Sequence, residues 1–182
     1  MKERNNNITA FGLVAEEPVF NHESNGEDFY KTFITVRRTS GTFDTLPVVI
    51  SDRIIDMKEI KVGDCVMITG QVRSHNLHIG EKSKLELFIF TENIEIYENE
   101  EELPFNNDVV LRGFICKEPI YRVTPLGREI TDVLIAINRA YGKSDYIPCI
   151  TWGRTAKFVG HLPVGTHIEM TGRFLSLIHI SE

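Results

Sequence analysis

The stretch that decides the fold is residues 107–173, NDVVLRGFICKEPIYRVTPLGREITDVLIAINRAYGKSDYIPCITWGRTAKFVGHLPVGTHIEMTGR. It alternates between short runs rich in β-branched and apolar residues and clusters of Gly, Pro and polar residues, which is the pattern of strands joined by turns. Four segments are predicted strands: 109–116, 130–139, 147–151 and 167–175. In residues 153–162 apolar side chains recur every three or four positions, which predicts one short helix.

The same pattern occurs earlier in the chain, shifted by 101 residues. Glu17-Pro18 matches Glu118-Pro119, and after a one-residue insertion Thr69-Gly70 matches Thr171-Gly172. Most identities fall at Gly and Pro, where turn geometry dictates the residue type. We interpret the chain as a duplicated domain. The first copy predicts strands at 8–15, 29–37, 46–50, 65–73 and 85–97, and a helix of two or three turns within 51–60.

Strand, strand, strand, helix, strand, strand is the chain order of an OB-fold, a small five-stranded Greek-key barrel. The predicted fold class is therefore all-β, with two tandem OB-fold barrels that each carry one short helix. We expect a first barrel at 1–98, an acidic linker at 99–106 and a second barrel at 107–182. Only six residues follow Ser176, so the second barrel is expected to lack its last strand, as in a truncated reading frame, with Leu177–Ile180 pairing at most as a short edge.

Charge and cysteines limit the classes of function. The net charge of −6 argues against a nucleic-acid partner, but residues 104–182 carry nine basic and seven acidic side chains, so the second half is slightly positive. The three cysteines form no CxxC pair and are expected to be reduced core thiols, with no metal site and no cofactor. No apolar run is long enough for a membrane helix, and the first residues do not form a signal peptide.

The second copy resembles the bacterial and phage single-stranded DNA-binding protein family over nearly its full length. The residues that carry the resemblance are Leu111-Arg112-Gly113, Glu118-Pro119, Gly127, Ala136-Ile137-Asn138-Arg139, Asp145-Tyr146-Ile147-Pro148, Trp152-Gly153-Arg154, Ala156, Val164-Gly165 and Thr171-Gly172-Arg173. The resemblance implies binding of single-stranded DNA without strong sequence preference, in replication, recombination or repair, in the cytoplasm with the nucleoid. It also implies a homodimer with four barrels and contacts with replication or repair proteins. Most members end in an acidic tail with a Pro-Phe tip; we interpret the similar string Glu100–Phe105 as linker.

Binding of single strands requires flat aromatic faces for the bases and positive charge for the backbone. Tyr146 and Trp152 match family positions of stacking aromatics, and their spacing of six places them on one face of a strand. Arg154 is expected at the next position on that face. The complete set of predicted contacts is Trp152, Tyr146, Arg139, Arg154, Tyr141, Lys143, Arg112, Arg122, Arg128 and Arg173. The alternatives are a core role for the aromatics, a solvated charge at a strand end for Arg139, and for Arg154 a structural role shared with Arg53 of the first copy.

The first copy has Thr45 and Ser51 where the second has Tyr146 and Trp152. It is therefore expected to serve mainly folding and assembly and to bind DNA weakly. Its weaker candidates are Arg37, Arg38, Phe43 and Arg53. The alternative function is an OB-fold protein-interaction module of a primosome or replisome. An enzyme is not expected, because the carboxylates show no convergent spacing for a metal, and RNA stays open as a ligand, since stacking does not distinguish the sugars.

Overall fold

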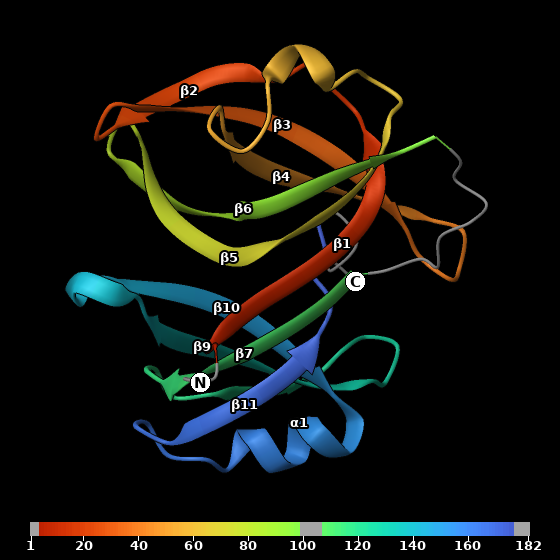
Figure 1. Ribbon diagram of the computed structural model, residues 1–182. Helices are drawn as coiled ribbons and strands as arrows, with labels where there is room; N and C mark the ends of the chain where they lie inside the picture. The colour runs from red at the N-terminus through yellow and green to blue at the C-terminus, as the bar shows by residue number, and fades with distance from the viewer. Residues whose placement is uncertain (1–3, 99–106, 177–182) are drawn as a thin grey trace.

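A computed structural model describes residues 4–98 and 107–176, and it contains two β-barrels, one above the other (Figure 1). The first is built from β1 (Asn6–Val14), β2 (Val19–Ser24), β3 (Glu27–Arg37), β4 (Phe43–Ser51), η1 (Met57–Glu59), β5 (Cys65–Ile79) and β6 (Lys82–Tyr97). The second is built from β7 (Asn107–Ile115), β8 (Ile120–Val123), β9 (Glu129–Asn138), η3 (Ala140–Gly142), β10 (Ser144–Trp152), α1 (Gly153–Gly160) and β11 (His167–Gly172). The predicted all-β class with tandem OB-fold barrels is confirmed. The division into domains at residues 99–106 stays a prediction, because those residues lie outside the described part of the chain.

The first barrel is closed by its last strand. β6 pairs antiparallel with β5 and parallel with β4, where Val48 is opposite Ile89. In the β5–β6 pair Gly70 is required, because a Cβ atom there would lie 2.0 Å from the carbonyl oxygen of Phe90. In the second barrel the repeat partner Gly172 has nothing within 4 Å of its Cβ position. Within the described residues no strand after β11 takes the place of β6. The predicted short edge at Leu177–Ile180 lies outside the described residues, so the missing last strand stays a prediction.

The two predicted helices differ in the structure. In the second barrel α1 buries Ala156 and Val159 against the barrel, so the predicted helix forms. In the first barrel only the single 3-10 turn η1 forms, capped by the Asp56 carboxylate, which accepts from the N–H of Lys58 at 2.9 Å. Ile55 and Met57 pack against the core in this region, but they are only partly buried, whereas α1 buries Ala156 and Val159. The expectation of a helix of two or three turns is therefore wrong for the first barrel.

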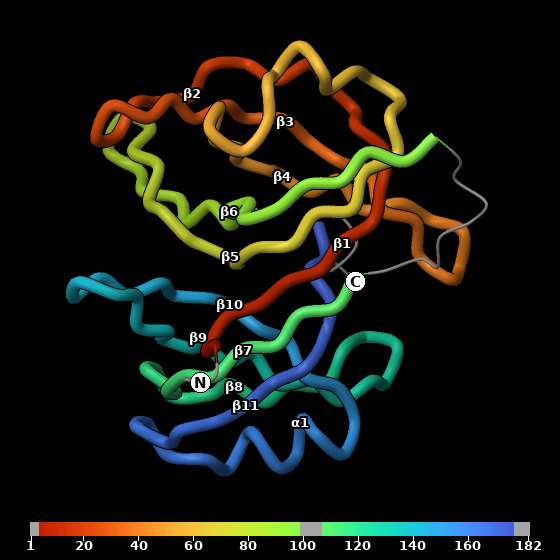
Figure 2. The backbone as a smooth tube through the Cα atoms, viewed as in Figure 1, coloured from red at the N-terminus to blue at the C-terminus, as the bar shows by residue number. Residues whose placement is uncertain are grey.

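The barrels are joined by a β1–β7 pair, and the tube view in Figure 2 shows these strands side by side at the junction. Ile8 lies opposite Val109, its own repeat partner, and the pairs on either side mirror each other. The two copies are thus related by an approximate two-fold axis within one chain, the arrangement of an isologous dimer interface. Buried aliphatic side chains of both barrels form one continuous cluster across this junction.

Two sets of hydrogen bonds between the barrels, which we call clasps, follow the same two-fold symmetry. The buried Asp145 carboxylate accepts two hydrogen bonds from Arg139, at 2.6 and 2.5 Å, and one from the N–H of Ser74 in the first barrel, at 2.9 Å. The hydroxyl of Ser74 accepts from the N–H of Tyr146 at 2.9 Å. The mirror-image clasp consists of Arg38, Asp44 and Ser176. Each barrel therefore holds a serine of the other barrel with a buried carboxylate.

Candidate nucleic-acid interface

β10 presents the two aromatic side chains that the sequence selected. Ile147 is buried, whereas Tyr146 and Trp152 are each 46% exposed and Pro148 is exposed between them. The alternation along β10 thus places these three side chains on the outer side of the sheet. We call the outward residues Tyr146, Pro148, Ile150 and Trp152 the β10 face. A face of this kind can stack two or more unpaired bases.

One arginine belongs to this face through strand register. Arg122 on β8 lies opposite Ile130 on β9, and Ile130 lies opposite Trp152 on β10. Paired residues of neighbouring strands point to the same side of a sheet, so Arg122 and Trp152 flank Ile130, about 10 Å apart at two strand spacings. Arg122 is 43% exposed and forms an ion pair with Asp132 at 2.9 Å. This geometry suits a phosphate contact beside a stacked base.

The turn between β9 and β10 carries a fully exposed aromatic ring. Tyr141 has φ +68° and is followed by Gly142 with φ +79°, and the Arg139 N–H donates to the carbonyl of Lys143 at 2.7 Å. A positive φ is unfavourable for a tyrosine by about 1 kcal/mol. Tyr141 buries no surface that offsets this cost, and Lys143 is exposed beside it. Both stay predicted contacts.

Besides Arg122, other predicted arginines also have partners within the fold. Arg139 and Arg38 are clasp residues whose side chains are 23% exposed. Arg112 on β7 binds Glu169 at 2.7 Å and the carbonyl oxygen of Arg4 at 2.9 Å. The geometry favours structural roles for the two clasp arginines, which the sequence did not predict. Their DNA contacts remain untested predictions.

Burial of Asp44 acts to raise its pKa, but the hydrogen bonds from Arg38 and Ser176, together with the Arg38 charge, outweigh it and hold the pKa below its usual range. The same hydrogen bond raises the pKa of Arg38 against the effect of burial. The clasp therefore holds both groups in their charged forms.

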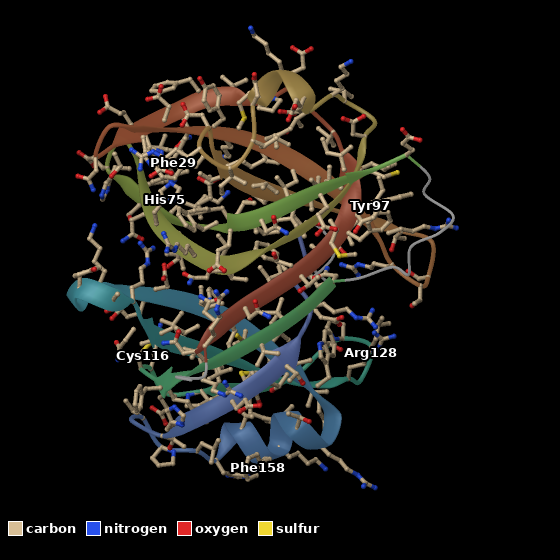
Figure 3. The ribbon with its side chains drawn as sticks, in the orientation of Figure 1. Phe29, His75, Tyr97, Cys116, Arg128 and Phe158 are labelled. Carbon is tan, nitrogen blue, oxygen red and sulfur yellow. The ribbon has the colours of Figure 1, made fainter. Side chains whose placement is uncertain are left out.

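Arg154 does not extend the β10 face as expected. β10 ends at Trp152, and Gly153, with φ +60°, turns the chain into α1, so Arg154 lies exposed in the first turn of that helix. Arg128 lies exposed in the loop between β8 and β9, at the far right of the lower barrel in Figure 3. Arg173 is exposed just after β11. The structure gathers none of these three around Trp152.

Two of the remaining first-barrel candidates form a cross-strand pair, and the third lies in the turn after β4. Arg37 and the 48% exposed Phe43 are opposite each other at the ends of β3 and β4. Arg53 lies 3.8 Å from Glu27. Sequence comparison with the second barrel missed a further group, the half-buried Phe33, Phe88 and Phe90. Their alternation with buried residues was visible in the sequence, but only the strand register shows that they adjoin.

The cysteines differ in burial. Cys65 is buried, and Cys149 packs against the core, where burial raises its pKa to about 12. Cys116 is exposed, so the expectation of a core thiol is wrong for this residue. Its thiol lies 3.4 Å from the carbonyl oxygen of Leu134. Among the residues with described positions, three or more His, Cys, Asp or Glu side chains nowhere gather as metal ligands would.

Two barrels with one aromatic strand face define a tandem OB-fold protein. Residues 106–176 match the model of the "Single-strand binding protein family", so the resemblance seen in the sequence is confirmed over that part. Over 74 residues the chain is 35% identical to "Single-stranded DNA-binding protein A" of Bacillus subtilis (strain 168), covering 37% of this chain and 43% of the relative. "Single-stranded DNA-binding protein B" of the same organism is 28% identical over 83 residues, covering 42% of this chain and 74% of the relative. The chain thus spans less than half the length of the first of these relatives.

The whole fold also has a solved counterpart. The crystal structure of the wild-type single-stranded DNA binding protein from Thermus aquaticus matches with a TM-score of 0.78 and 18% identity, over 93% of this chain and 84% of that one. At this identity the likeness establishes the fold alone. The matched proteins are named as binding proteins, in agreement with the expectation that the chain is not an enzyme. Across the described ranges, no helix combines the length and apolarity that crossing a bilayer requires.

Proposed function

We propose that the chain binds single-stranded DNA without strong sequence preference, through the β10 face of its second barrel. The observation that carries the proposal is the pair Tyr146 and Trp152, exposed on one side of β10 with Arg122 on the same side two strands away. Aromatic faces accept any base, and each stack contributes roughly 1–3 kcal/mol. The resemblance of residues 106–176 to single-strand binding proteins supports this assignment.

Phosphate contacts are the second part of the proposal. Arg122 and Lys143 flank the β10 face, and Arg128, Arg154 and Arg173 are exposed cations of the same barrel. Each phosphate neutralised releases counterions, so affinity falls with salt with a slope of roughly 0.7 per contact on single strands. A homodimer with four barrels, partners among replication and repair proteins, and a cytoplasmic, nucleoid-associated location complete the proposal, on the strength of the resemblance.

The test uses labelled oligo-dT and fluorescence anisotropy. Trp152→Leu and Tyr146→Leu remove one aromatic face each and keep apolar side chains, so affinity is expected to fall roughly 5-fold to 150-fold per substitution. Phe158→Leu is the matched control, because Phe158 is 67% exposed on α1, on the outer side of the lower barrel (Figure 3). Equal affinities for all four proteins would contradict the proposal. Absence of binding by the folded unsubstituted chain would favour the protein-interaction module.

A further inference from the structure

The first barrel carries an aromatic row that crosses three neighbouring strands. Phe33 on β3 lies opposite Pro47 on β4. Val48 and Ile89 are partners in the parallel β4–β6 pair, so Phe88, one residue back on β6, lies beside Pro47. Phe88 is in turn opposite Arg73 on β5. We call Phe33, Pro47 and Phe88 the first-barrel platform.

The platform faces outward. Its two phenylalanines and Pro47 are half-buried, whereas Ile34, Leu46, Val48 and Ile89, their neighbours along the three strands, are fully buried inside the barrel. The outer side of β4 is equivalent by the repeat to the β10 face of the second barrel, because Pro47 is the repeat partner of Pro148. The two barrels thus present aromatic side chains on corresponding sides, but from different strands.

Cations border the platform. Lys31 lies 5.4 Å from the centre of the Phe33 ring and binds Glu86 at 2.6 Å. Arg73 lies 3.6 Å from the centre of the Phe90 ring. His75 packs edge-on against Phe88, with ring centres 5.4 Å apart. Aromatic rings interleaved with cations are the composition of a single-strand binding groove.

The platform is continuous with the β10 face. Ser74, which follows Arg73, accepts a hydrogen bond from the N–H of Tyr146. Arg73 and Arg139 also line a cavity of about 140 Å³ between the barrels. Burial and the charge of Arg139 lower the pKa of Arg73, whereas the carboxylates of Asp145 and Glu92 act to raise it. One path therefore runs from Trp152 and Tyr146, past Arg73, to Phe88 and Phe33.

We propose that the first-barrel platform is a second base-stacking surface, and that one single strand crosses the barrel junction over Arg73 to occupy both surfaces. This proposal differs from the expectation of a weakly binding first barrel, which stays untested. It rests on the proposed function, because it requires a single strand on the β10 face. In this proposal the first barrel stacks bases on β3 and β6, because its β4 positions Thr45 and Ser51 carry no ring.

The test is a double substitution, Phe33→Leu with Phe88→Leu, which keeps apolar bulk and removes both aromatic faces. One OB-fold covers about 4–16 nucleotides, so labelled dT of about 8 nucleotides probes one face and dT of about 30 nucleotides probes both. We expect the double variant to bind the long strand at least about 10-fold more weakly and the short strand unchanged. Fewer nucleotides should also saturate each chain.

Two controls separate stacking from folding. Phe33→Tyr with Phe88→Tyr keeps the rings and should restore long-strand affinity, and Phe20→Leu removes a 55% exposed ring on β2, outside the platform, and should change nothing. If the double leucine variant binds the long strand like the unsubstituted chain while Trp152→Leu does not, the platform is refuted and the β10 face stands. If the unsubstituted chain binds neither strand, the proposed function itself fails. An equal loss of long-strand affinity in the leucine and tyrosine variants would show that the first-barrel platform has only a structural role.

Discussion

The clasp around Asp145 predicts that Arg139 stabilises the fold, and one substitution tests this. The Asp145 side chain is 1% exposed and the Arg139 side chain 23% exposed. Arg139→Ala therefore removes both arginine hydrogen bonds from a buried carboxylate, which keeps the hydrogen bond from the Ser74 N–H and the interaction with the charge of Arg73. Removing one member of a buried ion pair costs about 3–5 kcal/mol. We therefore expect Arg139→Ala to lower the free energy of unfolding by about that amount, measured by urea titration with circular dichroism.

If Arg139 contacts DNA instead, the same variant should change DNA binding and not stability. A lost phosphate contact would lower the salt slope of dT binding by roughly 0.7, while stability would hardly change. The structural account expects the slope to stay constant at salt and temperature where the variant is folded. Arg128→Ala is the control, because Arg128 is exposed in a loop and its loss should leave stability within about 0.5 kcal/mol. An unchanged stability for Arg139→Ala, with a reduced slope, would refute the clasp as the role of Arg139.

Three further predictions concern the frame of the two barrels. Gly70→Ala should lower the free energy of unfolding by at least about 2 kcal/mol, because its Cβ meets backbone, whereas Gly172→Ala should change it by less than about 0.5 kcal/mol; similar losses would contradict the account of an open seam. Asp44 has a lowered pKa, so the stability it contributes is complete above its unfolded pKa of about 4 and is lost as the pH falls through its folded pKa. Urea midpoints between pH 7 and pH 3 should therefore fall more steeply for the unsubstituted chain than for Asp44→Asn, and equal slopes would remove Asp44 from the acid response. Tyr141→Asn should keep or raise the free energy of unfolding, since asparagine tolerates a positive φ. It should also weaken dT binding at least about 5-fold. An unchanged affinity would show that the Tyr141 ring does not contact the strand.

Most strand positions could be predicted, because apolar alternation and the Gly and Pro residues of turns act locally, but the short exposed strands β2 and β8 were missed. The selection of Tyr146 and Trp152 used the family resemblance, and the period of a strand then placed both rings on one face. Arg154 was misplaced for a local reason as well: Gly153 turns the chain after Trp152, and spacing alone continued the strand.

The clasps and the first-barrel platform could not be predicted in this way. Ser74 and Asp145 are 71 residues apart, and nothing in either neighbourhood indicates that they meet. The row of Phe33 and Phe88 depends on a parallel β4–β6 register that no sequence period encodes. The repeat partners of Tyr146 and Trp152 are Thr45 and Ser51, so repeat positions alone give no indication of rings on β3 and β6.

The most direct test of the central claim is a fluorescence titration of Trp152, the only tryptophan, with poly-dT at two salt concentrations. Stacking of bases on the β10 face predicts quenching of this half-exposed ring, and counterion release predicts an affinity that falls as salt rises. A folded chain whose Trp152 emission does not change with poly-dT, at either salt concentration, would contradict the assignment of the β10 face as the single-strand site.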